Sequence, residues 1–266
     1  MFNIDETVNE LMKTGGKGMT RPTEQGDFSL HDAYNVAHQL ANTQRANGKT
    51  LAGRKIGISN RAAWDSLGLT DVVWGYVFSD TVFEAKQNAY TLSLDGLSQP
   101  KLEPEIVFGL NAALPAGTRN GAALLKSAEW IALGFEVVQC PYENWQFKPA
   151  DLVATFGFHG ALIIGEKKMI DDPEALARAL VNTSATLYKD DTVVHEGGGT
   201  NVVDPPAAAL GHIADLIAAD GDATPLAAGE LITTGTLTAA PAIGAGESYR
   251  VSVSELGLAD LTLTLR

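Results

Sequence analysis

The sequence predicts an α+β protein in which a short helical segment precedes a mixed, curled β-sheet. Up to about residue 50 the apolar side chains recur with helical spacing, whereas from Gly53 onward short β-rich runs are broken by Gly, Pro, Asn and Asp. Strands are many, helices are few, and strands and helices do not alternate regularly, so a doubly wound parallel sheet is not indicated. We therefore expect an N-terminal helical segment at residues 1–50 and a main sheet domain at residues 51–266.

Two helices are expected in the N-terminal segment. Residues 4–14 place apolar side chains on one helical face. A second helix begins after Ser29, whose side chain suits an N-cap, and continues to about Asn47, where Gly48 ends it. The segment joining the two helices is rich in glycine, which predicts a loop.

The main domain is expected to hold ten strands and three helices. Two pairs of neighbouring strands, 183–189 with 192–196 and 248–254 with 260–266, are predicted to form hairpins. One helix has Asp172 as its cap and proline at its first position. The predicted strands are 54–59, 73–78, 103–110, 131–139, 161–165, 183–189, 192–196, 230–234, 248–254 and 260–266, and the predicted helices are 120–129, 172–182 and 206–219.

Composition excludes several classes of partner. The chain has 266 residues, is 45% hydrophobic and carries a formal net charge of −13, so it can bury a core but lacks the basic surface that nucleic acids or anionic membranes attract. It has no run of eighteen apolar residues and no signal-peptide pattern at its start. Cys140 is the only cysteine, which leaves no disulfide framework. We expect a cytoplasmic protein that binds neither nucleic acid nor membrane.

The stretch "PKLEPEIVFGL" at residues 100–110 carries two glutamates inside an apolar strand. Side chains alternate along a strand, so Glu103 and Glu105 share one face with Val107. Two like charges that close repel each other unless water or a cation relieves them. The pattern is typical either of a strand with one solvated face or of a cation site.

A third carboxylate, Glu136, lies in the apolar run "EWIALGFEVVQC". A buried carboxylate must be paired, protonated or bound to a metal, because isolated burial costs several kcal/mol. It is either a satisfied core or edge group, or a third oxygen ligand beside Glu103 and Glu105. Three carboxylates on neighbouring strands would suit Mg²⁺ or Mn²⁺.

Other polar residues have a functional and a structural interpretation. Lys55, in "AGRKIGIS", lies within a strand and could bind a carboxylate or transfer protons, although most lysines are solvated. Asp80 ends the strand "VFSD" and suits a turn as well as a catalytic site. "TTGTLT" at 233–238 is a weak anion-binding signal, and the "HEGGGTN" segment at 195–201 predicts a loop because the next helix begins several residues later.

The five histidines differ in their expected surroundings and roles. His31 and His38 lie on the second predicted helix and are expected to be exposed, and His195 and His212 have no recognisable partners. His159, in "FGFHGALIIG", lies between aromatic residues and an apolar strand, where it is either catalytic or packed in the core. The sequence contains no HExxH, GxSxG or GxGxxG pattern, so zincin, α/β-hydrolase and Rossmann folds are unsupported.

The order of these pieces resembles a known family. "KIGIS", "GYVFSD", "PKLEPEIVF", "ALGFEVV", "GALIIG", "NVVDPPAAALGHIADLI" and "LITTGTLT" follow one another as in the hydratase/decarboxylase branch of the fumarylacetoacetate hydrolase superfamily, which includes 2-hydroxypenta-2,4-dienoate hydratase and 4-oxalocrotonate decarboxylase. The resemblance covers nearly all of residues 50 to 266. It implies a sheet roll like the C-terminal domain of that superfamily, with catalysis in residues 51–266.

The resemblance also implies site residues. The E-x-E pair and the later acid would hold one Mg²⁺ or Mn²⁺, which assigns Glu103, Glu105 and Glu136 as metal ligands. By the same comparison Lys55 and Asp80 are catalytic, and Gly235 and Thr236 bind the substrate carboxylate. Where many relatives read "DNASSG", this chain reads "TFGFHG" at 155–160, so that His159 replaces a serine that lines the site. We predict that His159 is a general acid/base with a pH-rate limb near neutrality.

The function implied is a metal-dependent hydratase or decarboxylase for an unsaturated 2-oxo acid in the catabolism of aromatic-type compounds. A metal-dependent acylpyruvate-type C–C hydrolase and an oxaloacetate-type decarboxylase are the enzymatic alternatives. A non-catalytic partner subunit of a pathway complex is the alternative of another class, and it would require a broken metal triad. We expect a homo-oligomer with a small-molecule substrate.

Overall fold

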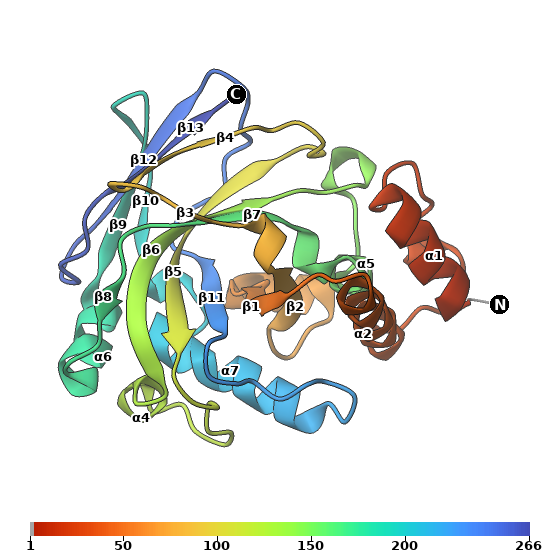
Figure 1. Ribbon diagram of the computed structural model, residues 1–266, viewed down its shortest axis with the longest axis horizontal. Helices are drawn as coiled ribbons and strands as arrows, with labels where there is room; N and C mark the ends of the chain where they lie inside the picture. Colours follow the sequence, from red (N-terminus) through yellow and green to blue (C-terminus); the bar gives the residue numbers. More distant parts are fainter. Residues whose placement is uncertain (1–2) are drawn as a thin grey trace.

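The computed structural model describes residues 3–266, and its larger sheet has eight strands (Figure 1). Those strands are β1 (Leu51–Gly57), β2 (Val73–Phe78), β3 (Val82–Glu84), β5 (Lys101–Leu110), β6 (Ala128–Val138), β7 (His159–Ile164), β8 (Lys168–Met169) and β11 (Leu231–Thr236). They follow the order β2-β1-β11-β5-β6-β7-β3, with β8 paired to β6. β1 with β11 and β3 with β7 are parallel pairs, whereas β5 and β6 are antiparallel, so the sheet is mixed.

A second sheet of five strands completes the main domain. Its strands are β4 (Ala89–Leu92), β9 (Ser184–Lys189), β10 (Thr192–Gly198), β12 (Ser248–Val253) and β13 (Leu261–Leu265), in the order β10-β9-β12-β13-β4. β9 with β10 and β12 with β13 are antiparallel neighbours, so both predicted hairpins are confirmed. The predicted mixed, curled sheet is also confirmed, although its division into two sheets was not predicted.

The main helices begin and end close to the predicted residues, with one exception. The helices are α1 (Ile4–Thr14), α2 (Leu30–Ala46), α3 (Trp64–Leu67), α4 (Gly121–Leu125), α5 (Pro149–Ala154), α6 (Pro173–Asn182) and α7 (Pro206–Ala219). Ser29 caps α2 in a reciprocal capping box with Asp32, and Asp172 caps α6. The helix predicted at 120–129 is too long, because β6 already begins at Ala128. The short elements α3, α5, β3, β4 and β8 were not predicted.

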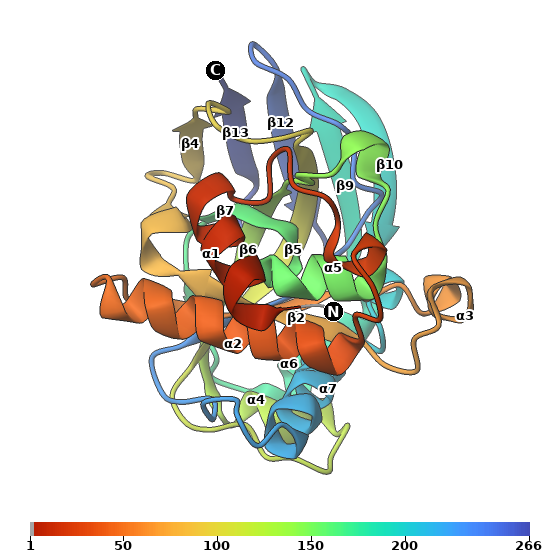
Figure 2. The same cartoon turned by 90° about the vertical axis from the view of Figure 1, so that its right-hand side faces the viewer.

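The helices form two groups. In the first group α2 contacts both α1 and α5. α2 and α5 also contact β2, and Figure 2 shows this group in front of that strand. α4, α6 and α7 pack together below the sheet in Figure 1, and α7 contacts β11. The prediction of residues 1–50 and 51–266 as separate units stays a prediction.

One stretch, Gly199–Ala219, is long and apolar enough to cross a membrane by length and composition alone. However, 67% of its most apolar window is buried inside the protein, as in the core helix of a folded domain. α7, which fills most of this stretch, packs against α4, α6 and β11. Its apolar character is therefore explained by the protein core.

Two histidines differ from the expectation. His38 is buried rather than exposed, with Nδ1 2.8 Å from the Tyr76 hydroxyl and Nε2 2.9 Å from Asp220 Oδ2. His212, for which no partner was expected, lies 2.6 Å from Asp71 Oδ1 and 2.9 Å from Asp204 Oδ2. Both tie a helix to a distant loop, which residue spacing along one helix cannot predict.

Candidate active site

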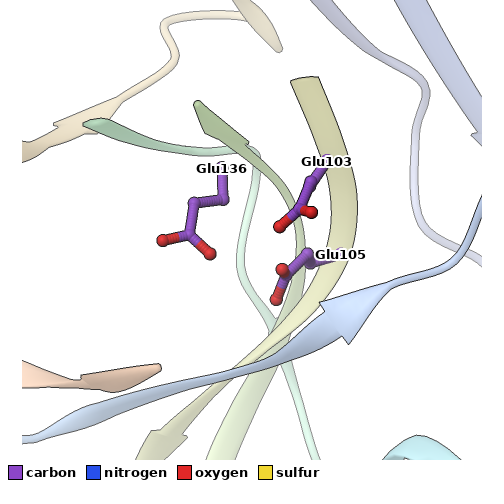
Figure 3. Close-up of side chains that lie close together, drawn as sticks. All are labelled: Glu103, Glu105 and Glu136. Atoms are coloured by element: carbon purple, nitrogen blue, oxygen red, sulfur yellow. The ribbon is translucent and has the colours of Figure 1, made fainter. Parts of the chain in front are cut away.

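Three glutamates meet where β5 pairs with β6. Glu103 lies directly opposite Glu136 in the antiparallel register, and Glu105 follows two residues along β5 on the same face. One carboxylate oxygen from each lies within 4.8 Å of the others. Figure 3 shows the carboxylates of Glu103 and Glu105 side by side and turned toward the Glu136 side chain. The structure thus brings the three predicted metal ligands together.

Lys55 and His159 flank the third carboxylate. The Lys55 Nζ lies 2.9 Å from Glu136 Oε2, with both side chains almost completely buried. His159 Nδ1 lies 2.7 Å from Glu136 Oε1, and its Nε2 lies 2.9 Å from the Thr81 hydroxyl. The Thr81 hydroxyl also lies 2.8 Å from the Phe78 carbonyl, so Thr81 fixes the far side of the His159 ring. Glu136 is therefore held at both oxygens.

Burial and neighbouring charges shift the pKa values of the three glutamates in different directions. Burial raises the pKa of Glu103 to about 7. The charge of Lys55 opposes this rise, and the charge of Glu136 adds to it. Burial and the two neighbouring carboxylates raise the pKa of Glu105 well above its usual range. Burial acts in the same direction on Glu136, but Lys55 and His159 outweigh it and lower that pKa. Burial lowers the pKa of the Lys55 ammonium, but the three neighbouring carboxylates outweigh it, so that this pKa is raised.

Gly235 and Thr236 lie at the end of β11, beside the carboxylates. The Gly235 N–H donates to Glu105 Oε2 at 2.8 Å, and its φ of +96° lies in the left-handed region that favours glycine. A Cβ at this position would lie 2.1 Å from Ser59 Oγ, so a larger residue would displace Ser59. The backbone here therefore approaches both the cluster and the segment that follows β1.

A cavity of about 200 Å³ opens beside the cluster. Lys55, Glu103, Gly235 and Thr236 line one part of it. The rest is mainly apolar, and its lining includes Ile58, Val138, Trp145, Phe147, Leu152 and Phe158. Sequence reasoning missed Ser59, Asn60, Trp145 and Phe147 in this lining, although polar residues straight after a strand in "KIGISN" and aromatic residues in the loop "PYENWQFKP" were visible signals.

A larger cavity of about 670 Å³ adjoins the first. The two share Ser59, Asn60 and Thr236 in their linings. Arg61 and Asp204 line the larger cavity and approach each other at 3.4 Å. The larger cavity therefore lies directly beside the one that borders the carboxylates.

Asp80 is not brought to the cluster. It lies in the turn Ser79–Thr81, with its side chain 48% exposed and its Oδ2 2.8 Å from the Lys49 Nζ. It lines neither cavity of the site, and Thr81 is the residue of this turn that reaches His159. The turn thus directs the Asp80 carboxylate to the surface, and its catalytic role stays a prediction.

His159 lies beside Glu136 and away from the cavity lining. Both ring nitrogens are engaged, with Glu136 and Thr81, and the ring does not line the cavity. A general base must reach the proton that it removes directly or through one water. The geometry therefore supports a positioning role of His159 on Glu136, and its acid/base role on the carbon chain stays a prediction.

Known proteins resemble this chain over most of its length. The 2-keto-4-pentenoate hydratase 2 of Dechloromonas aromatica is 30% identical over 226 residues, which is 85% of this chain and 82% of that protein. The chain belongs to the hydratase/decarboxylase branch of the fumarylacetoacetate hydrolase superfamily. A second member of this branch, the 2-hydroxyhexa-2,4-dienoate hydratase of Comamonas testosteroni, is 29% identical over 240 residues, covering 90% of this chain and 88% of that protein. No family model matches the chain.

Solved structures of the superfamily share the fold. The 4-oxalocrotonate decarboxylase from Pseudomonas putida G7, complexed with magnesium and adipate, superposes with a TM-score of 0.87 at 22% identity, covering 99% of this chain and 96% of that one. The fumarylpyruvate hydrolase from Pseudomonas aeruginosa, in complex with Mn²⁺ and pyruvate, gives a TM-score of 0.61 at 14% identity over 80% of this chain and 88% of that one. The predicted family and fold are therefore confirmed.

The donor atoms of this chain fit a hard divalent cation. Glu105 Oε1 is buried without a hydrogen-bond partner among the described residues, which is costly unless something outside the protein satisfies it. The three carboxylates form an all-oxygen donor set, the type that Mg²⁺ and Mn²⁺ prefer. The group offers neither a cysteine sulfur nor a histidine nitrogen, so it does not suit a thiophilic metal.

Proposed function

We propose that this protein is a lyase: a metal-dependent hydratase or decarboxylase that acts on an unsaturated 2-oxo acid in the catabolism of aromatic-type compounds. The observation that carries the proposal is the cluster of Glu103, Glu105 and Glu136 beside Lys55 at the wall of a cavity. The names of the related hydratases and of the decarboxylase with the same fold support it. The intact acidic triad argues against a non-catalytic partner subunit.

In this proposal Glu103, Glu105 and Glu136 hold one Mg²⁺ or Mn²⁺. When bound, the cation supplies Lewis acidity toward the 2-oxo oxygen and the adjacent carboxylate of the substrate. His159 and Lys55 fix the two oxygens of Glu136, and the Gly235 N–H orients Glu105. These contacts hold the ligands before any substrate arrives, so little reorganisation is needed.

Lys55 is the catalytic residue of the proposal. Among the described residues that line the smaller cavity, it provides the only cationic side chain. Its ammonium would stabilise the negative charge that develops on the 2-oxo oxygen and exchange the proton that enters or leaves the carbon chain. The Thr236 and Ser59 hydroxyl groups, which line the cavity, would orient the substrate carboxylate.

Turnover assays test the proposal. The purified protein is expected to consume 2-hydroxydienoates or unsaturated 2-oxo dicarboxylates in the presence of Mg²⁺ or Mn²⁺ and to stop when the cation is chelated. A matched assay with acylpyruvates and oxaloacetate measures the alternative C–C hydrolase and decarboxylase activities. Cation-dependent turnover of acylpyruvates alone would overturn the proposal in favour of the hydrolase.

The cellular setting forms part of the same proposal. The net charge of −13 argues against nucleic acid and anionic membranes as partners, and a small-molecule substrate is implied by the enzyme relatives. We propose a cytoplasmic homo-oligomer. Light scattering at micromolar concentration, which measures the mass of the assembly, tests the oligomer directly.

Cation affinity should depend on pH. In the cation-free protein Glu103 has a pKa of about 7, so at pH 6 it mostly carries a proton that binding must release. Glu105, whose pKa is raised well above its usual range, must release a proton as well. We therefore expect the affinity for Mg²⁺ or Mn²⁺ to rise with pH by about tenfold per unit for each proton released, with a smaller slope above pH 7, where Glu103 is already ionised. Calorimetry in buffers of different ionisation enthalpy measures both affinity and proton release; a pH-independent affinity would contradict the prediction.

His159 should influence the cation through Glu136. His159→Phe removes the hydrogen bond to Glu136, and loss of such a supporting contact typically weakens metal binding or activity about 10–100-fold. His159→Gln keeps a donor and is expected to retain more of the affinity. His31→Phe, on an exposed helix position, is the control. Unchanged cation affinity in His159→Phe would exclude the proposed positioning role.

A further inference from the structure

We propose that the loop of residues 139–148, held by Gln99, selects substrates whose far end is apolar and rejects those with a second carboxylate there. This inference rests on the proposed function and narrows it to monocarboxylic unsaturated 2-oxo acids. Trp145 and Phe147 from this loop, with Phe158, form an apolar wall of the smaller cavity. We refer to these three residues as the aromatic wall.

The aromatic wall is a packed unit. The rings of Phe147 and Phe158 meet edge to face with centroids 4.9 Å apart, and those of Trp145 and Phe158 do so at 5.8 Å. Leu152 and Ile58, which also line the cavity, belong to the same apolar cluster. A ligand that reaches the wall therefore meets closely packed hydrocarbon.

Gln99 holds the loop in place although its own side chain is exposed. Its Nε2 donates to the carbonyl groups of Cys140 and Tyr142 at 3.0 and 2.7 Å, and its Oε1 accepts the Asn144 N–H at 2.9 Å. The Trp145 indole N–H donates to the Gln99 carbonyl at 3.0 Å. Asn144 and Trp145 have φ of 54° and 55°, a conformation that is uncommon for residues other than glycine, and the contacts with Gln99 help to hold it.

Charge at the wall would not favour a second carboxylate. The cation in the cavity lining, Lys55, is already paired with Glu136. Lys101 lies over the Trp145 ring, with Nζ 4.2 Å from its centroid, but does not line the cavity. Arg61 lines the neighbouring cavity, where it approaches Asp204 and the Trp64 ring. A carboxylate against the aromatic wall would thus be desolvated without a partner, which is strongly unfavourable.

A matched pair of substrates tests the proposal in the Mg²⁺-loaded protein. One is 2-hydroxyhexa-2,4-dienoate, which ends in a methyl group, and the other carries a carboxylate in place of that methyl group. We expect kcat/KM to be at least about 10²-fold higher for the methyl-ended compound, because burying an unpaired charge costs several kcal/mol. Equal or greater kcat/KM for the dicarboxylate would overturn the proposal.

Substitutions in the loop and at Gln99 should change the ratio of kcat/KM for the methyl-ended compound to kcat/KM for the dicarboxylate. Phe147→Arg supplies a cation at the wall and is expected to lower the ratio at least about tenfold, whereas Phe147→Leu should keep it within a few-fold. Gln99→Ala releases the loop and should lower the ratio by about tenfold with little change in cation affinity. Gln87→Ala is the matched control, because Gln87 is also exposed and its φ of +55° is close to the +49° of Gln99. None of the hydrogen bonds found among the described residues involves the Gln87 side chain. A ratio that is insensitive to Phe147→Arg and to Gln99→Ala would overturn the assignment of the wall.

Binding of unreactive compounds separates this inference from the proposed function. Saturated 2-oxo acids of the same length, one methyl-ended and one carboxylate-ended, are titrated into the Mg²⁺-loaded protein by calorimetry. Tighter binding of the methyl-ended acid supports the wall even if neither dienoate is consumed, a result that would count against the proposed reaction alone. Tighter binding of the dicarboxylate overturns the proposed selectivity of the aromatic wall. Cation-dependent turnover would in that case still support the proposed reaction.

Discussion

Replacing Lys55 with methionine is expected to abolish most cation-dependent turnover while the protein keeps its fold and its cation. Methionine preserves much of the volume of the lysine side chain but removes the ammonium that lies 2.9 Å from Glu136. A positioned acid/base group typically contributes about 10²–10⁴ in rate, so kcat should fall by at least about 10². Steady-state kinetics, circular dichroism and metal analysis of the same preparation measure the three quantities.

The Lys55→Met variant must be compared at saturating cation. Without the cation, removal of the ammonium leaves the buried Glu136 carboxylate facing Glu103 and Glu105, and loss of one partner of a buried pair is strongly destabilising. Lys49→Met is the control, because Lys49 pairs with the exposed Asp80 at the surface. A kcat close to that of the unmodified protein would return Lys55 to a purely structural role.

The second large effect is expected for the acidic triad. The protein should bind about one Mg²⁺ or Mn²⁺ per chain, and Glu103→Gln or Glu136→Gln should weaken that binding severely, because each change replaces a charged oxygen ligand by a neutral amide. Isothermal calorimetry measures affinity and stoichiometry together. Turnover is expected to fall in parallel with the bound cation.

A control on the same strand separates ligand loss from general disturbance. Glu129→Gln alters an exposed glutamate of β6 and should leave cation binding unchanged. Equal binding in the unmodified protein and in both triad variants would exclude the triad as the metal site. The orphaned Glu105 Oε1 would then require another ligand to explain its burial.

Local patterns in the sequence predicted the elements that local forces control. Capping by Ser29 and Asp172 and the apolar stripe of each helix were sufficient for α2 and α6, because these interactions join residues three or four positions apart. Alternation along β5 placed Glu103 and Glu105 on one face for the same reason. The helix predicted at 120–129 failed at its end, where pairing of β6 with β5 extends the strand back to Ala128.

The sequence by itself determined the class of fold, the carboxylates that can act as ligands and, through the resemblance, the family. Only the tertiary structure decided which side chains meet. The register of β5 against β6 set Glu103 opposite Glu136, the turn after β2 sent Asp80 to the surface and Thr81 to His159, and Gln99 brought the aromatic loop to the cavity. Such contacts join residues far apart in the chain, so their energies depend on packing and register, which no local pattern of residues encodes.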